Sequence, residues 1–156
     1  MMSETSDLMR RSVILIVDDE PANVTLLERL LKREGFTDLL MATDPREGLR
    51  LFQEHPVDLV LLDLMMPDLD GYALLESFSR LVPAQAYLPI LVLTADVTLP
   101  ARRRALSLGA KDFLTKPFDA IEVVLRIFNL LETRILTLEL AKHGLPRPNS
   151  PRPMFG

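Results

Sequence analysis

Short apolar runs alternate with amphipathic segments five times along the chain. The run Val13–Val17 is apolar at every position, which is typical of a strand that is covered on both faces. Similar runs at 57–62, 89–94 and 112–115 predict three more strands. A run at 37–42, which Asp38 interrupts, predicts another.

Helical spacing of apolar residues follows each of these runs. Pro21 marks the beginning of the first predicted helix, and Gly35 is a plausible C-cap for it. Further helices are expected from Asp44, from Tyr72, over Leu99–Leu108 and from Asp119. Strands and helices that alternate with short connections predict an α/β fold, a doubly wound (βα)5 arrangement around a mostly parallel sheet.

The last predicted helix is longer than one domain requires. Its apolar positions follow the three-four spacing of a coiled-coil seam, namely Ile121, Val124, Phe128, Leu131, Ile135 and Leu138. The alternative is a slightly long helix that folds back on its own domain. We expect a disordered N-terminus at 1–11, a domain at 12–131, a helical extension at 132–143 and a Pro-rich linker or tail at 144–156.

Composition narrows the class of protein. The 156 residues are 48% apolar and 26% charged, which excludes a mostly disordered chain. The net charge of −4 gives no indication of nucleic-acid or anionic-membrane binding. The absence of cysteine excludes disulfides, thiolate metal sites and a cysteine nucleophile. No apolar run approaches the roughly 20 residues of a bilayer span, and the N-terminus lacks a signal peptide, so a cytoplasmic protein is expected.

Polar side chains follow the predicted strands where ligands collect in a doubly wound sheet. Asp18 and Asp19 follow the first strand, Asp63 the third, Thr94 the fourth and Lys116 the fifth. Each aspartate taken alone could be a helix N-cap. Three carboxylates at one edge repel one another, so they are expected to be protonated or to bind a cation. Ligands that are all oxygen atoms favour Mg²⁺ over zinc. Carboxylates, a cation and a lysine that converge suggest an aspartyl phosphate.

These residues are part of a wider set of motifs over residues 12–131. In chain order they are Ile-Val-Asp18-Asp19-Glu20, Leu-Leu-Asp63-Leu-Met-Met-Pro67-Asp-Leu-Asp-Gly71, Leu-Thr94-Ala95, Gly109-Ala110 and Lys116-Pro117-Phe118. In these motifs and their spacing the chain resembles the receiver domain of two-component response regulators. The resemblance implies the strand order 2-1-3-4-5.

The resemblance also implies a phosphoacceptor and a metal site. Asp63 would accept a phosphoryl group from a phosphohistidine. Asp19 and Asp63 would bind Mg²⁺ directly, Asp18 would do so directly or through water, and the backbone carbonyl of Met65 would complete the protein ligands. Mn²⁺ would be able to replace Mg²⁺.

The remaining implied roles concern the response to phosphorylation. Thr94 would hydrogen-bond the phosphoryl group and move inward, Lys116 would pair with it, and Pro117 would follow a cis peptide bond. Phe113 would be the aromatic switch, so that the face formed by the fourth helix, fifth strand and fifth helix changes. Met65 and Asp96 would tune hydrolysis of the acyl phosphate.

The implied partners are a histidine kinase or phosphotransfer protein as donor, and an output domain or a separate downstream protein. We also expect a homodimer through the fifth helix. The domain is expected to be a signalling phosphoacceptor that catalyses only its own phosphorylation and dephosphorylation, and any output activity would lie outside this chain.

Two other functions are weaker. A phosphatase of the haloacid dehalogenase type needs a second aspartate two residues after its nucleophile, where this chain has Met65. A phosphorylation-independent interaction module would be expected to have lost Asp19, Asp63 or Lys116, and all are present. The run Arg102–Arg104 is interpreted as a solvated helix face, because adjacent helical residues point in different directions.

Overall fold

The computed structural model describes residues 4–66, 69–83, 86–96 and 98–144. Five parallel strands form one sheet in the order β2-β1-β3-β6-β7, which confirms the predicted order 2-1-3-4-5 when only the strands of this sheet are counted. The elements are α1 (Glu4–Arg10), β1 (Val13–Val17), α2 (Pro21–Arg33), β2 (Asp38–Ala42), α3 (Pro45–Glu54), β3 (Leu59–Asp63), β4 (Met65–Met66), β5 (Leu69–Asp70), α4 (Gly71–Leu81), β6 (Ile90–Thr94), α5 (Leu99–Ser107), β7 (Asp112–Thr115) and α6 (Ala120–Lys142).

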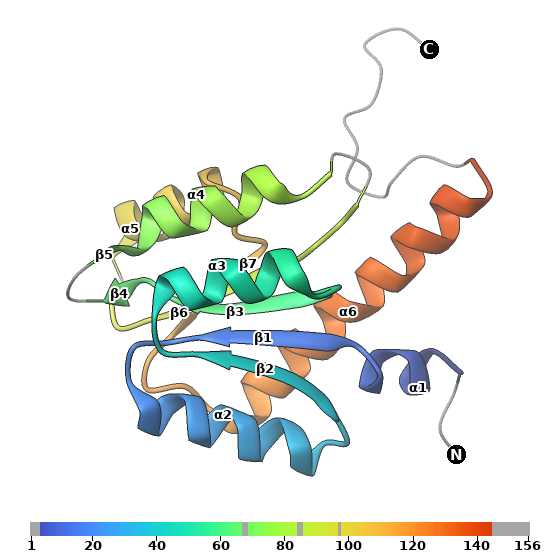
Figure 1. Ribbon diagram of the computed structural model, residues 1–156, viewed down its shortest axis with the longest axis horizontal. Coiled ribbons are helices and arrows are strands. Elements are labelled where there is room, and N and C mark those ends of the chain that lie inside the picture. The colour runs from blue at the N-terminus through green and yellow to red at the C-terminus, as the bar shows by residue number, and fades with distance from the viewer. Residues whose placement is uncertain (1–3, 67–68, 84–85, 97, 145–156) are drawn as a thin grey trace, which may run out of the picture.

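Helices cover both faces of the sheet, so the molecule has three layers (Figure 1). The α2 and α6 helices pack on one face, around a core that includes Ile14, Leu27 and Ile127. The α3, α4 and α5 helices cover the other face, around a core that includes Val60 and Phe78. Burial on both faces explains why the central strands are apolar almost throughout.

The N-terminus differs from the sequence-based expectation of disorder over residues 1–11. Residues Glu4–Arg10 form the helix α1, and Met9 is buried in the same core as Ile127. The Arg10 Nε donates a hydrogen bond to the carbonyl of Glu34, and its guanidinium lies 5.4 Å from the ring centroid of Phe128. A polar segment is therefore held in place by a few contacts with residues distant in sequence.

A short hairpin follows β3 where the sequence indicates only a turn. The β4 and β5 strands pair antiparallel, with Met65 opposite Asp70 and Met66 opposite Leu69. Pro67, part of the expected motif, lies outside the described residues. Gly71 follows the hairpin, and a Cβ atom there would lie only 2.2 Å from the carbonyl oxygen of Leu64. Glycine thus permits the close approach that begins α4.

The α6 helix is continuous through Lys142, but its expected coiled-coil seam lies partly inside the domain. Val124 and Leu131 are buried, whereas Ile121 is 72% exposed. Residues 145–156, which include most of the predicted Pro-rich tail, lie outside the described residues. Within the described part of the chain, no helix has both the length and the apolar character needed to cross a bilayer.

Candidate phosphoacceptor site

The predicted site residues lie together at the carboxyl edge of the sheet. Asp63 is the last residue of β3, and Asp18 follows β1 directly. Because the strands are parallel, their ends meet at this edge. One carboxylate oxygen from each of Asp18, Asp19 and Asp63 lies within 4.8 Å of the other two. The sequence-based grouping of the three carboxylates is therefore present in the structure.

Among the described residues, Lys116 is the cation that contacts these carboxylates. Its Nζ lies 2.8 Å from the Oδ2 of Asp18 and 3.2 Å from the Oδ2 of Asp63. The Lys116–Pro117 peptide bond is cis. Asp18 and Asp63 are only 2% and 5% exposed, so two buried carboxylates share one ammonium group.

Backbone donors orient the carboxylates from the loops that follow the strands. The N–H of Met65 donates to Oδ1 of Asp63 at 3.0 Å. The N–H of Glu20 donates to Oδ1 of Asp18 at 2.9 Å. Such Asx-type turns hold each side chain at its strand end and leave Oδ2 facing Lys116.

The pKa shifts follow from burial and crowding of charge. Burial raises the pKa of the Asp63 carboxyl above its ordinary value and the negative Asp18 adds to the increase, although the N–H of Met65 and the ammonium of Lys116 oppose it. Burial alone would lower the pKa of Lys116, but the hydrogen bond to Asp18 and the charges of Asp63 and Asp18 raise it overall. The group therefore carries more negative charge than its one lysine balances.

The remaining predicted residues surround the carboxylates. Thr94 ends β6, is 1% exposed, and its Oγ1 accepts a 3.3 Å hydrogen bond from the N–H of Asp96. Phe113 lies in β7 with its side chain buried in the core under α3, α4 and α5. Met65 is 57% exposed beside the site.

Asp96 is engaged in a helix cap. Its Oδ1 accepts hydrogen bonds from the N–H and the hydroxyl of Thr98, the N-cap of α5. These two donors, the N–H first, lower the pKa of Asp96.

Sequence reasoning missed part of the surroundings of this site. A cavity of about 620 Å³ borders Asp19, one of the three carboxylates, and Tyr72, Arg104 and Asp70 line it together with Thr94. The pattern predicted that Arg102–Arg104 is a solvated face, and no spacing rule pairs Arg104 with Tyr72. Only the packing of α5 beside α4 brings them together.

Residues 14–128 match the family described as "Response regulator receiver domain". The Bacillus subtilis alkaline phosphatase synthesis transcriptional regulatory protein PhoP is 41% identical over 118 residues, which cover 76% of this chain and 48% of PhoP. The response regulator GtcR of Aneurinibacillus migulanus is 39% identical over 114 residues, 73% of this chain and 45% of GtcR. The chain thus spans about half the length of the curated relatives it matches.

Solved structures agree with this assignment. A CheY-like receiver domain protein from Methanospirillum hungatei superimposes with a TM-score of 0.74 at 27% identity, covering 81% of this chain and 98% of that one. A response regulator from Chloroflexus aurantiacus gives a TM-score of 0.70 at 34% identity, covering 78% and 98% of the two chains.

Proposed function

The chain belongs to the response regulator receiver family of two-component systems, and from this premise we propose that Asp63 is the residue that accepts the phosphoryl group. The observation that carries the proposal is the position of Asp63, whose Oδ2 faces Lys116 beside Asp18 and Asp19. A buried carboxylate beside two others and one lysine is costly in a structural role, and it suits a nucleophile that receives a phosphoryl group.

In the proposed transfer, a carboxylate oxygen of Asp63 attacks the phosphorus of a phosphohistidine. A P–O bond forms as the P–N bond breaks, and the imidazole nitrogen leaves with the electron pair. Lys116 balances the added charge from its position 3.2 Å from Asp63. The new group brings roughly −1.5 to −2 charges and strong acceptor oxygens, so counter-charge at this point stabilises the product.

The same residues fit a divalent cation. Oxygen ligands from Asp18, Asp19 and Asp63 lie within 4.8 Å of one another, and their buried negative charge exceeds that of Lys116. Hard oxygen ligands suit Mg²⁺, and Mn²⁺ by the same chemistry. We propose that Asp19, Asp63 and the Met65 carbonyl bind Mg²⁺, with Asp18 bound directly or through water. When bound, the ion neutralises charge on the transferring phosphoryl oxygens.

The proposed response begins at Thr94. Its hydroxyl would turn from the N–H of Asp96 to donate to a phosphoryl oxygen, drawing the end of β6 toward Asp63. The buried ring of Phe113 lies on the next strand, in register with Val92 of β6. Movement of Thr94 and Phe113 would change the surface of α5, β7 and α6. Met65 and Asp96 line the cavity next to Asp19 and Thr94, and we propose that water reaches the acyl phosphate from this side, so that the two residues tune its hydrolysis.

The proposed partners are a histidine kinase or phosphotransfer protein as donor, and an output domain or downstream protein as recipient of the signal. The proposed compartment is the cytoplasm, as expected from the sequence. A homodimer through α6 is also proposed, because packing leaves Leu125 and Leu136 58% and 50% exposed on this helix. A monomeric sedimentation profile at high micromolar concentration, with and without beryllofluoride, would contradict the dimer.

Intact mass after incubation with acetyl phosphate tests the phosphoacceptor proposal. We expect one added phosphoryl group with Mg²⁺, and none with EDTA or in Asp63→Asn. If acetyl phosphate gives no gain, a panel of histidine kinases is tried next. Failure with both donors would favour the alternative function, an interaction module that works without phosphorylation.

A further inference from the structure

The cavity of about 620 Å³ beside the carboxylates has a cation on its wall. Asp19 and Thr94 form the side of the cavity next to the acceptor edge, while Tyr72 of α4 and Arg104 of α5 form another part of its wall. Figure 1 shows these two helices running side by side above the hairpin of β4 and β5. Leu64 and Met65, the two residues that follow Asp63 in the chain, also line the cavity, so a donor held there lies near the acceptor edge and beside Arg104.

Arg104 is positioned by an aromatic ring. Its Cζ lies 4.0 Å from the ring centroid of Tyr72, the distance of a guanidinium stacked on a π face. Its contact with Asp70, 3.8 Å between Nη2 and Oδ2, is longer than a hydrogen bond, and both side chains are more than half exposed. The stacking with Tyr72 therefore fixes the guanidinium more than the ion pair does.

The N–H donors of Arg104 are available for a ligand. Among the described residues, no oxygen accepts a hydrogen bond from its guanidinium, whereas Arg50, Arg80, Arg126 and Arg134 each donate to acceptors in the protein. A planar guanidinium with unused donors is the side chain that best matches phosphate oxygens. Arg104 has this chemistry beside the acceptor edge.

Charge around the cavity makes such a cation necessary. Asp19, Asp70 and Asp96 all line it, and Arg104 is the one cation among its described lining residues. Lys116 already contacts Asp18 and Asp63. A dianionic donor is repelled by these carboxylates, and a guanidinium at the wall offsets the repulsion.

We propose that Arg104, positioned by Tyr72, binds the phosphoryl group of the incoming donor and makes the site selective for dianionic donors. The inference rests on the proposed function of Asp63. With acetyl phosphate, the Asp63 oxygen forms the new P–O bond, the P–O bond to the acyl group breaks, and acetate leaves with the electron pair. Arg104 acts before this step and is not changed by it.

Two donors of different charge test the proposal in the full chain with Mg²⁺. Acetyl phosphate is a dianion at neutral pH, and phosphoramidate is a monoanion. Initial rates of phosphorylation are followed by intact mass over a range of donor concentrations for wild type, Arg104→Gln, Tyr72→Phe and Tyr72→Leu. Arg103→Gln is the matched control, since Arg103 is exposed on the same helix and does not line the cavity.

Loss of one charge-assisted contact predicts a decrease of about tenfold in kcat/KM with acetyl phosphate for Arg104→Gln, mainly through KM. The decrease with phosphoramidate is expected to be about threefold or less, and the difference between Arg104→Gln and wild type with acetyl phosphate should become smaller as salt increases. Tyr72→Phe keeps the ring and should retain the kcat/KM of wild type with acetyl phosphate. The kcat/KM of Tyr72→Leu should lie between the values of wild type and Arg104→Gln. Arg103→Gln should match wild type.

Phosphoimidazole, a small mimic of phosphohistidine, adds a third arm that separates the two sources of the phosphoryl group. If Arg104→Gln lowers the phosphorylation rate with acetyl phosphate but not with phosphoimidazole, Arg104 acts on small acyl phosphate donors. If it lowers the rate with both acetyl phosphate and phosphoimidazole, its role extends to the kinase reaction. Equal rates in Arg104→Gln and wild type, or equal decreases with both charge types of donor, would overturn the proposal. A wild-type chain that gains no phosphoryl group would instead overturn the function assigned to Asp63.

Discussion

The β3 strand has a carboxylate at each end, and the two ends show how a structural site differs from a reactive one. Asp63 is its last residue, and Asp58 immediately precedes its first, Leu59. Both side chains meet a cation, Lys116 at one end and Arg134 at the other. The surroundings of the two pairs are otherwise opposite.

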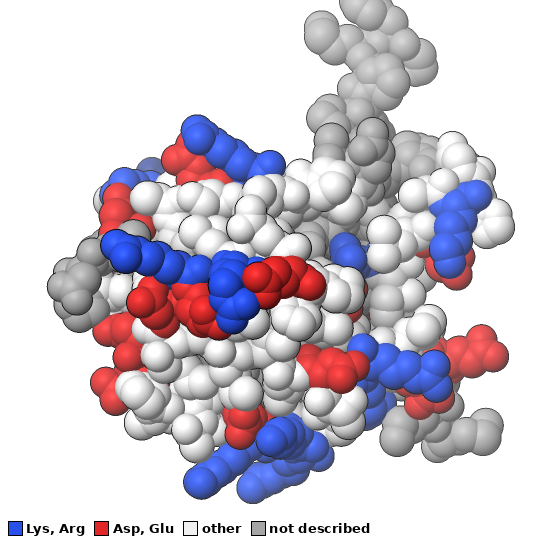
Figure 2. Space-filling view, in the orientation of Figure 1, with Lys and Arg blue, Asp and Glu red and all other residues white. Residues whose placement is uncertain are grey.

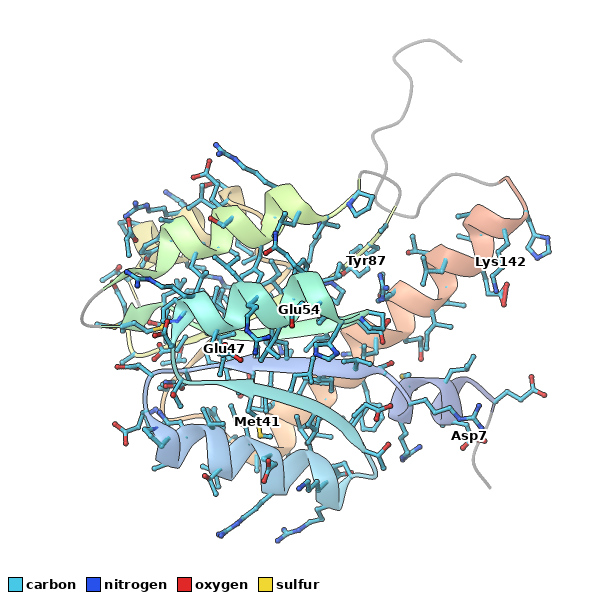
Figure 3. The ribbon with its side chains drawn as sticks, viewed as in Figure 1. Asp7, Met41, Glu47, Glu54, Tyr87 and Lys142 are labelled. Atoms are coloured by element: carbon cyan, nitrogen blue, oxygen red, sulfur yellow. The ribbon has the colours of Figure 1, made fainter. Side chains whose placement is uncertain are left out.

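At the Asp58 end every charge has a partner. Oδ2 of Asp58 accepts from the N–H of Val13 at 2.8 Å, and Oδ1 accepts from Nε of Arg134 at 3.0 Å. The Nη1 of Arg134 also donates to the carbonyl of Tyr87, which lies beside α6 in Figure 3. The network joins α6, β1 and the start of β3 with one negative and one positive charge.

At the Asp63 end three carboxylates lie close together, and the one ammonium group in contact with them pairs with two, Asp18 and Asp63. The excess charge lowers the stability of the folded chain, because buried like charges repel one another. This loss of stability is offset when a cation binds to the carboxylates. Charge is thus balanced at the Asp58 end of β3 and unbalanced at the Asp63 end, where we propose that phosphorylation takes place.

The largest effect is expected from Asp63→Asn. It removes the nucleophile and keeps the shape, so phosphorylation by acetyl phosphate is lost completely while the fold is retained. Because the substitution also removes one of the crowded carboxylates, the free energy of unfolding without metal should not decrease. Intact mass and urea unfolding measure the two results. A marked loss of stability would mean that Asp63 has a structural role like that of Asp58.

The next largest effect is expected from Arg134→Met, which leaves Asp58 and the Tyr87 carbonyl without their donor. Removing one partner of a mostly buried ion pair should lower the free energy of unfolding by about 2 kcal/mol. Arg126→Met is the control, since Arg126 lies on the same helix in an ion pair with Asp112 but is 44% exposed. Equal effects of the two substitutions in urea unfolding would refute the distinction between them.

A smaller effect is expected from pH. The raised pKa of Asp63 means that the folded chain binds a proton more tightly than the unfolded chain does. This contribution to stability is complete below the ordinary aspartate pKa, and it is lost as pH rises through the raised value. Without metal, the free energy of unfolding of wild type relative to Asp63→Asn should therefore decrease as pH rises over this range.

Mg²⁺ should oppose this decrease, because it binds the ionised carboxylates of the folded chain. Thermal unfolding at several pH values, with Mg²⁺ or EDTA, measures both effects. A difference between wild type and Asp63→Asn that stays constant with pH would contradict the crowding of charge at this edge.

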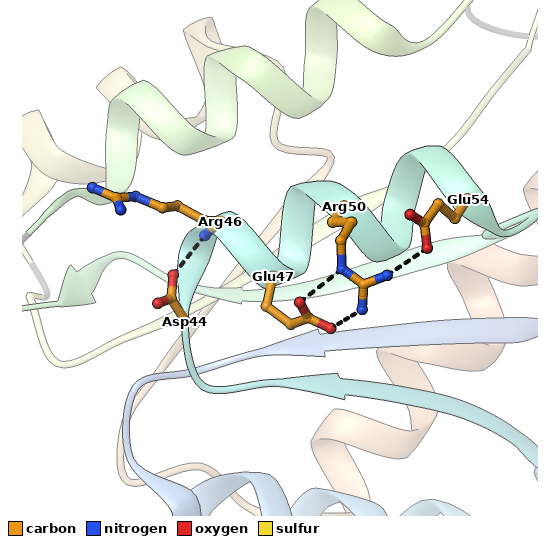
Figure 4. Close-up of polar contacts among 5 residues, drawn as sticks. All are labelled: Asp44, Arg46, Glu47, Arg50 and Glu54. Carbon is orange, nitrogen blue, oxygen red and sulfur yellow. Dashed lines mark hydrogen bonds and ion pairs between the residues drawn. The ribbon is translucent and has the colours of Figure 1, made fainter.

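The smallest effect is expected on the surface of α3. Arg50 contacts Glu47 and Glu54 there (Figure 4), in a group of both charges that Figure 2 shows on the molecular surface. These side chains are about half exposed, where solvent and side-chain entropy offset ion pairing. Arg50→Gln should leave the melting temperature unchanged within error, and a clear decrease would show that exposed pairs also stabilise this fold.

The sequence predicted the reactive end of β3 better than the structural end. Asp63 and Thr94 each end a strand, and Asp18 and Lys116 each follow one directly, so strand order alone brings the four residues to one edge. Asp58 and Arg134 are 76 residues apart, and neither position has a pattern that distinguishes a buried pair from two solvated charges. The stacking of Arg104 on Tyr72 was likewise not predicted, because no sequence pattern at either position indicates the contact.

Local patterns were also insufficient at the ends of the domain. Glu4–Arg10 is polar enough to resemble a disordered terminus, and Met9 and Arg10 hold it against distant residues. In α6, the three-four spacing correctly predicted a long helix. It did not show that Val124 and Leu131 face the domain's own core, because a core-facing stripe and a dimer seam have nearly the same period.

The most direct test is to map the modified residue. The chain is phosphorylated with acetyl phosphate and Mg²⁺, the acyl phosphate is reduced with borohydride, and the peptides are sequenced by mass spectrometry. Reduction converts an aspartyl phosphate to homoserine, and we predict homoserine at position 63 alone. Homoserine at position 18 or 19, or at position 58 in the balanced network, would contradict the claim that unbalanced charge at the carboxyl end of β3 identifies the phosphoacceptor.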